Sequence, residues 1–149
     1  MNQVITSPQT QEEFEEYYKL RWKMLRAPWG EPKGSEQDEL DKTAIHIMAM
    51  VNDRIVGCCR LQINTKEQAQ VRYMAVDDSL QGKGIGRLML KRAEELALNQ
   101  GISEMMLETR DIAVEFYKRN GYQPLKKSYV LFGDIQHITM TKKLIINAD

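Results

Sequence analysis

The run Gln81-Gly82-Lys83-Gly84-Ile85-Gly86 has the composition of a phosphate-binding turn. It lies where a predicted strand, 69–76, gives way to a predicted helix, 85–99. Glycines let the backbone turn sharply with its amides pointing inward. The unpaired N–H groups of a helix start, together with the positive end of the helix dipole, then favour an anion. The run is therefore predicted to hold a pyrophosphate.

Spacing separates three phosphate-binding patterns that these residues could follow. A Walker loop ends in Gly-Lys followed by Ser or Thr, whereas Lys83 lies between glycines and no Ser or Thr follows it. The dinucleotide fingerprint Gly-x-Gly-x-x-Gly needs a glycine where this chain has Arg87. The pattern that remains is Gln-x-x-Gly-x-Gly, carried by Gln81, Gly84 and Gly86.

This pattern resembles the acyl-coenzyme A pyrophosphate loop of the GNAT superfamily of N-acetyltransferases. A second stretch, AVEFYKRNGY at 113–122, is similar to a helix that follows a strand in the same family. The resemblance implies that Tyr117 protonates the departing thiolate and that acetyl-CoA is the co-substrate. It assigns the cofactor to Tyr117, to the strand end and to the glycine turn, namely Met74, Ala75, Val76, Gln81, Gly82, Lys83, Gly84, Ile85, Gly86 and Arg87.

Two further positions bear on the cofactor and the acceptor. The family often has Asn where this chain has Arg110, and an arginine there could instead reach a phosphate or an acidic substrate group. Arg21, Trp22 and Trp29 lie where the family often shapes the acceptor pocket, so we assign them to the substrate. The structural alternative for these three is a helix end followed by a surface loop.

The chemistry of acyl transfer constrains the catalytic roles. A lysine-like amine has a pKa of about 10.4, so its deprotonation at neutral pH costs on the order of 4 to 5 kcal/mol and needs a proton relay. We assign His137 as the general base, with His46 and Glu108 as alternatives and a purely structural role open for each. A tyrosine hydroxyl with a pKa of about 10 can protonate a thiolate of pKa near 8.5, which suits Tyr117 to the acid role.

The resemblance implies an N-acetyltransferase that moves acetyl from acetyl-CoA to a primary amine by direct attack. A small-molecule amine is the first choice, and a protein amine stays open. The rival from another class is a catalytically silent acyl-CoA-binding regulatory module, which needs the glycine turn but not Tyr117. A dinucleotide-dependent oxidoreductase comes third.

Composition limits the other classes of partner. The chain has 149 residues, enough for a single domain over 1–149, and its 21 Lys and Arg balance 21 Asp and Glu. This balance gives no sign of a nucleic-acid or acidic-membrane partner. Two cysteines and two distant histidines lack metal-ligand spacing, so no metal is expected. The apolar runs are too short to span a bilayer and the N-terminus lacks a signal peptide, which predicts a cytoplasmic protein; a homodimer stays open.

The elements that must position these residues follow from periodicity and turn chemistry. Strands are predicted at 2–6, 44–51, 55–63, 69–76, 103–109, 124–132 and 135–142, and helices at 11–26, 85–99 and 113–120. Asn52-Asp53 and Gly133-Asp134 are expected to close hairpins. This order is similar to that of the GNAT family, and the resemblance implies an α/β (α+β) fold of GNAT type, with a mixed, mostly antiparallel central sheet of about seven strands flanked by helices.

Overall fold

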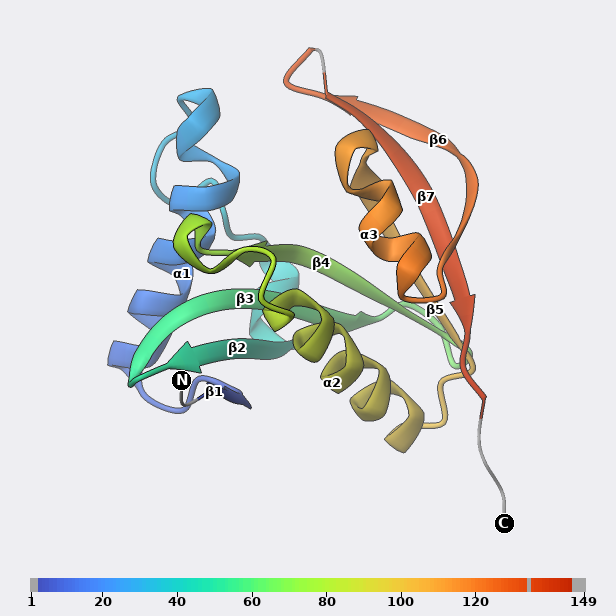
Figure 1. Cartoon of the computed structure of the whole chain (residues 1–149), viewed down its shortest axis with the longest axis horizontal. Coiled ribbons are helices and arrows are strands. Elements are labelled where there is room, and N and C mark those ends of the chain that lie inside the picture. The colour runs from blue at the N-terminus through green and yellow to red at the C-terminus, as the bar shows by residue number, and fades with distance from the viewer. Residues whose placement is uncertain (1–2, 134, 146–149) are drawn as a thin grey trace.

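The computed structural model describes residues 3–133 and 135–145, so the predictions for Asn2 and Asp134 lie outside the described residues. Within this part of the chain seven strands form one sheet in the order β1-β2-β3-β4-β5-β7-β6 (Figure 1). The strands are β1 Gln3–Thr6, β2 Ile45–Val51, β3 Arg54–Ile63, β4 Gln68–Val76, β5 Glu104–Arg110, β6 Gln123–Leu131 and β7 Ile135–Lys143. The pair β4–β5 is parallel and the other neighbours are antiparallel, which confirms the predicted fold class.

In the described ranges three α-helices cover the sheet, and the core is divided between its two faces. They are α1 Gln11–Leu25, α2 Ile85–Asn99 and α3 Val114–Arg119. Apolar residues of α2 and α3 pack with one set of strand side chains, whereas Tyr17 and Leu20 of α1 pack with another set. Cys58 and Cys59, neighbours in β3, fall into opposite sets, as the alternation of a strand requires, and both are free thiols.

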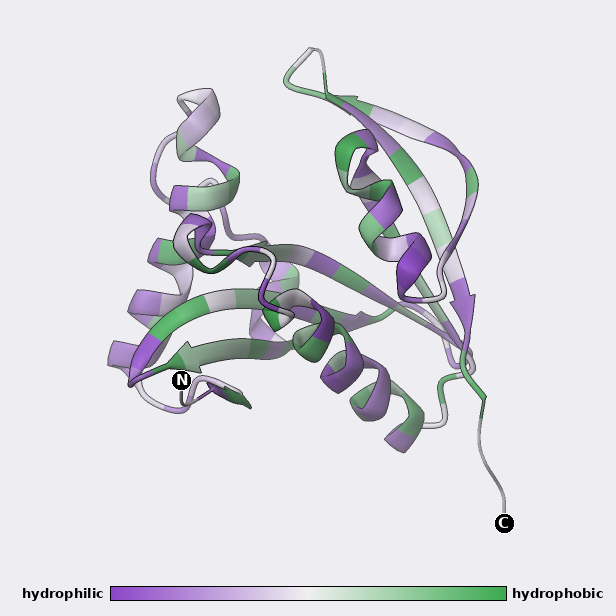
Figure 2. Cartoon of the chain, in the orientation of Figure 1, coloured by the Kyte–Doolittle hydropathy of each residue, from purple (hydrophilic) through white to green (hydrophobic). Residues whose placement is uncertain are grey.

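Local signals in the sequence account for several ends of these elements. Thr10 and Glu13 form the predicted capping box at the start of α1, with the Glu13 amide donating to Thr10 Oγ1 at 3.1 Å. Asn52 and Asp53 both have positive φ, as a two-residue hairpin turn between β2 and β3 demands. Hydrophilic and hydrophobic residues alternate along α2 in Figure 2, and its apolar side, including Met89 and Ala93, is buried. No helix in the described ranges has the length and apolarity to cross a bilayer.

The sheet opens between β4 and β5. These strands pair only from Gln68↔Glu104 to Val71↔Leu107, and beyond that point they run apart (Figure 1). β4 also carries a bulge. Arg72 pairs with Arg60 and Ala75 pairs with Cys58, so Tyr73 and Met74 of β4 lie opposite one residue of β3, Cys59. Tyr73 in this bulge has φ +57. A bulge bends its strand, so β4 turns away from β5 and leaves a wedge in the middle of the sheet.

Candidate active site

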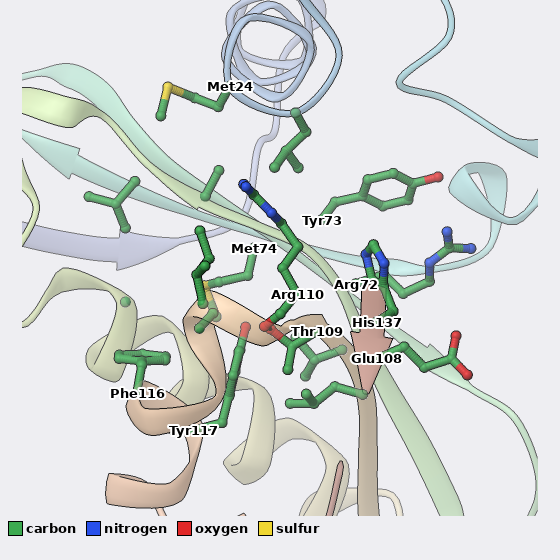
Figure 3. Close-up of a pocket in the computed structure, with 18 of the residues that line it drawn as sticks. Met24, Arg72, Tyr73, Met74, Glu108, Thr109, Arg110, Phe116, Tyr117 and His137 are labelled. Carbon is green, nitrogen blue, oxygen red and sulfur yellow. Dashed lines mark hydrogen bonds between the residues drawn. The ribbon is translucent and has the colours of Figure 1, made fainter. Parts of the chain in front are cut away.

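A cavity of about 980 Å³ lies where β4 and β5 diverge (Figure 3). Its walls come from the ends of α1, β4 and β5, the turn before α2, α3 and the β6–β7 hairpin. Most of the predicted site residues line it, namely Trp29, Met74, Ala75, Val76, Gln81, Gly82, Gly84, Ile85, Gly86, Arg87, Tyr117 and His137. Lys83 is exposed on the same turn but is not part of the wall.

The glycine turn presents backbone donors to the cavity. Gly82 and Gly84 adopt φ of +78 and +83, which L side chains rarely do, and Gly84 is the cap of α2. The bond from the Leu88 amide to the Gly84 carbonyl, at 3.1 Å, closes the first helical turn. The amides of Ile85 and Gly86 precede that bond and have no intrahelical acceptor. The turn therefore has the free N–H groups and the dipole that a pyrophosphate needs.

Glycine is needed at Gly84 and Gly86 for different reasons, the positive φ at Gly84 and the limited space at Gly86. A Cβ on Gly84 would meet no heavy atom within 4 Å, so a side chain there would extend into open space beside the turn. A Cβ on Gly86 would lie 3.2 Å from Phe116 Cζ, so Gly86 allows α2 to approach α3. Gln81 holds the turn from within, since its Nε2 donates to the Val76 carbonyl and to Asp78 Oδ1, both at 3.1 Å.

Burial keeps the Tyr117 hydroxyl protonated. Its side chain extends from α3 into the cavity (Figure 3), and the residue is 6% exposed. Burial raises the pKa of Tyr117 above its usual value, and the nearby Cys59 adds to the rise. No hydrogen bond to a described side chain or backbone group lowers it. The phenol therefore keeps its proton at neutral and alkaline pH, which a general acid requires, while the raised pKa also makes it a weaker acid.

The three candidates for the general base have different surroundings. His137 lies in the cavity wall, where Nδ1 is 3.1 Å from the Ile135 carbonyl and the ring stacks on Tyr129 with 4.3 Å between centroids. When Nδ1 donates to that carbonyl, Nε2 is left with a free lone pair. Glu108 also lines the cavity, with Oε1 3.5 Å from the Thr139 hydroxyl.

His46 lies outside the cavity and both of its ring nitrogens are occupied. Nδ1 is 3.1 Å from the Tyr17 hydroxyl, and Nε2 is 2.8 Å from the Asp41 carbonyl. Burial lowers the pKa of His46, which keeps the ring neutral in the core. His46 therefore serves packing and hydrogen bonding between α1 and β2.

The assignment of Arg21 and Trp22 to the substrate needs correction, because neither residue reaches the cavity. Arg21 is fully buried and pairs with Asp41, with Nη1 to Oδ1 at 2.9 Å. Trp22 donates from Nε1 to the Glu31 carbonyl at 3.0 Å. Neighbouring residues on a helix point in different directions, so a residue beside those that face the cavity can point away from it. The residue type alone does not predict this direction. Trp29 does line the cavity and stacks on Phe132, with 5.7 Å between centroids.

Several residues of the cavity wall were not predicted from the sequence. They are Arg26, Arg72 and Phe132. Arg110 also lines the wall, at the position where the family often has Asn. Arg72 lies in the predicted strand just before the cofactor segment, and that position was the one available signal. Among the residues that the structure describes, no group of three His, Cys, Asp or Glu side chains could hold a metal ion.

The fold and the motifs agree with comparisons against known proteins. The model of the acetyltransferase (GNAT) family matches residues 14–122. A Chlorobaculum tepidum protein described as an uncharacterized N-acetyltransferase is 30% identical over 97 residues, and the match covers 65% of this chain and 61% of that protein.

Two solved structures share the fold. The structure of a Lactobacillus plantarum protein, provisionally assigned as an N-acetyltransferase, has a TM-score of 0.85 at 20% identity, with 97% of this chain and 100% of that chain covered. A GNAT family acetyltransferase from Elizabethkingia anophelis, solved with acetyl-CoA bound, has a TM-score of 0.79 at 20% identity, with coverage of 96% and 99%. Since the family model covers most of the chain, this chain belongs to the acetyltransferase (GNAT) family.

Proposed function

We propose that this protein transfers the acetyl group of acetyl-CoA to the primary amine of a small molecule by direct attack. The observation that carries the proposal is the continuous cavity at the divergence of β4 and β5, because it joins the glycine turn to Tyr117 and His137. A donor that binds through phosphates at one end and reacts at the other needs such a continuous space. The Elizabethkingia neighbour, which carries acetyl-CoA in the same fold, supports this donor.

The residues of the cavity fit the donor. The amides at the start of α2 would hold the pyrophosphate, and the unpaired edge of β4 at Met74–Val76 offers backbone groups to the pantetheine amides in the manner of an added strand. Acetyl-CoA would supply a thioester carbonyl carbon, which an amine nitrogen can attack. An N–H of the same β4 edge would stabilise the negative charge that develops on the carbonyl oxygen.

Proton movements balance between two side chains. His137 Nε2 would accept the proton that the amine loses, because its lone pair is not engaged by a described residue. Tyr117 would donate its hydroxyl proton to the sulfur as the carbon–sulfur bond breaks, and it would regain a proton from solvent after release of the thiol. Positioned acid and base groups each contribute typically a factor of 10² to 10⁴ in rate.

The first test is ligand binding by thermal shift with acetyl-CoA, NAD and ATP in parallel. A ligand present at 100 times its Kd adds about 2.7 kcal/mol of stability. We expect a shift with acetyl-CoA, followed by thiol release when an amine panel is added. A shift with NAD alone would reject the proposal. Binding of acetyl-CoA without turnover of any amine would favour the catalytically silent module.

The base assignment has its own test. His137→Asn places an amide N–H where Nδ1 donates to the Ile135 carbonyl and removes Nε2, so kcat should fall at least tenfold while the Kd for acetyl-CoA stays within twofold. Glu108→Gln is the matched variant for the other candidate base in the wall, the carboxylate of Glu108. If E108Q loses rate and H137N does not, the base is Glu108. The cytoplasmic location, the use of a protein amine and a homodimer stay predictions.

A further inference from the structure

The charged side chains that line the cavity are strongly unbalanced. Five are arginines and one is Glu108, although the whole chain carries equal numbers of basic and acidic residues. Arg87 and Arg119 belong to α2 and α3, on the side of the glycine turn. The other three, Arg26, Arg72 and Arg110, come from α1's end, β4 and β5. The phosphates of the donor account for the first group only.

Arg110 is the arginine of this second group that lacks a partner most clearly. It makes no ion pair with a carboxylate in the described part of the chain, and its Nε is buried without a hydrogen-bond acceptor. Its guanidinium lies over the Trp29 ring, 5.1 Å from the centroid, so the side chain is held by stacking and its N–H groups stay unused. A guanidinium held in this way can bind a carboxylate or phosphate through two N–H groups at once.

Arg26 and Arg72 add charge that is only partly compensated. Arg26 donates from Nε to the Ser35 carbonyl at 3.2 Å and from Nη1 to the Leu25 carbonyl at 2.9 Å, which orients it without neutralising it. Arg72 lies 3.6 Å from Asp38, but Asp38 is closer to Arg60, at 2.6 Å. Glu108 of β5 offsets only one of the three charges of this group, so the wall keeps a net positive charge on the side away from the glycine turn.

The sheet places this positive charge next to the assigned base. Arg110 of β5 is the register partner of His137 of β7, and directly opposed residues project from the same face of a sheet (Figure 3). When the amine of an acceptor lies at His137, a group a few bonds away in the same acceptor molecule can reach Arg110. Neighbouring cations also lower the pKa of an amine, which reduces the cost of its deprotonation. A polycationic acceptor would be repelled by the same side chains.

We infer, on the basis of the proposed function, that the acceptor is a small primary amine with a carboxylate or phosphate a few bonds from the amine, and that Arg110 binds this anionic group. Arg26 and Arg72 reinforce the attraction. Arg110 thereby determines which amines are accepted, whereas the glycine turn determines the donor.

Matched pairs of amines test this inference. The carboxylate arm compares β-alanine with β-alaninamide, and the phosphate arm compares phosphoethanolamine with ethanolamine; each arm is extended to longer and branched members of the same series, and putrescine is the cationic probe. The readout is kcat/KM from thiol release at saturating acetyl-CoA. In at least one arm the anionic member should exceed its neutral partner by tenfold or more, and putrescine should be the poorest substrate. The arm with the larger ratio identifies the anion.

Variants assign the selectivity to Arg110. Arg110→Gln should reduce the ratio within the favoured pair to about one while the Kd for acetyl-CoA stays within twofold. Arg92→Gln is the matched control, because Arg92 lies on α2 outside the cavity, is 45% exposed and pairs with Glu95 at 3.3 Å. It should leave the ratio unchanged.

The outcomes separate this inference from the proposed function. If acetyl-CoA does not bind, the proposed function fails first. If acetylation occurs but the neutral or cationic member is preferred, or if R110Q keeps the ratio, the inference is overturned. If acetyl-CoA binds and no pair is acetylated, calorimetry of the same pairs on the coenzyme A complex decides, and equal affinity within each pair rejects the anionic acceptor.

Discussion

Replacement of Tyr117 by Phe removes one hydroxyl group, and the structure allows its effects on rate and stability to be separated. The hydroxyl makes no hydrogen bond with the described residues, so its loss leaves no buried group without a partner. The free energy of unfolding should therefore change by less than about 0.5 kcal/mol. Loss of a general acid should lower kcat by about 100-fold or more, which corresponds to about 2.7 kcal/mol in the activation barrier.

Tyr122 supplies a matched control from the same region. Its ring centroid lies 5.9 Å from that of Tyr117, but its hydroxyl donates to Glu94 Oε2 at 2.9 Å and the residue does not line the cavity. Tyr122→Phe should cost about 1 to 2 kcal/mol of stability because a hydrogen bond to a charged acceptor is lost. The melting temperature should fall by roughly 3 to 6 °C, and kcat should stay unchanged.

Three measurements on each variant complete the test: Tm, the Kd for acetyl-CoA by calorimetry, and kcat by thiol release from pH 6 to 10. Because burial raises the pKa of Tyr117, the wild-type rate should not fall between pH 8 and 10 through ionisation of this phenol. The acid role is refuted if Y117F turns over at the wild-type rate, or if it loses affinity for acetyl-CoA with turnover preserved.

Three other perturbations follow from the geometry. Gly84→Val places a β-branched side chain at φ +83 beside the turn, so the Kd for acetyl-CoA measured by calorimetry should rise at least tenfold. The circular dichroism spectrum should still be that of a folded protein. An unchanged Kd would contradict the assignment of the loop. Arg21→Met leaves Asp41 with only part of its buried partners, so urea denaturation should report a loss of about 3 kcal/mol; a loss below about 1 kcal/mol would show that the remaining pair with Arg60, at 3.0 Å, suffices. Burial lowers the pKa of His46, so below about pH 6.5 the unfolded chain binds a proton that the native chain does not, and stability falls with decreasing pH. His46→Gln should therefore flatten the dependence of Tm on pH between pH 5 and 7. An unchanged slope would contradict this argument.

Features determined within a few residues of chain could be predicted. The capping box at Thr10, the hairpin turn at Asn52-Asp53 and the glycine turn before α2 each depend on local backbone chemistry, and each lies where the sequence indicates. The order of the strands within the sheet was not predicted, because alternation shows that a segment is a strand but not which strand lies beside it.

The bulge in β4 could not be predicted, although the cavity depends on it. The segment 69–76 alternates as an ordinary strand, and Tyr73 is not a residue type that signals positive φ. Two other elements contact its ring, since the guanidinium groups of Arg21 in α1 and Arg60 in β3 lie 4.4 and 4.8 Å from the ring centre, and the neighbouring Arg72 lies at 4.8 Å. Contacts from α1 and β3 thus stabilise a backbone state that the local sequence disfavours.

The arginines on the acceptor side of the cavity could not be predicted from the sequence, because their availability depends on the fold. Arg21 is neutralised in the core by Asp41, twenty residues further along the chain, whereas Arg110 has Asp111 next to it in sequence and makes no ion pair with it. Whether an arginine is available to a ligand thus depends on carboxylates that the fold brings near it, and sequence distance does not predict these. Strand pairing sets Arg110 opposite His137, so the proposed anion binding and the proposed proton acceptance would share one register position in the sheet.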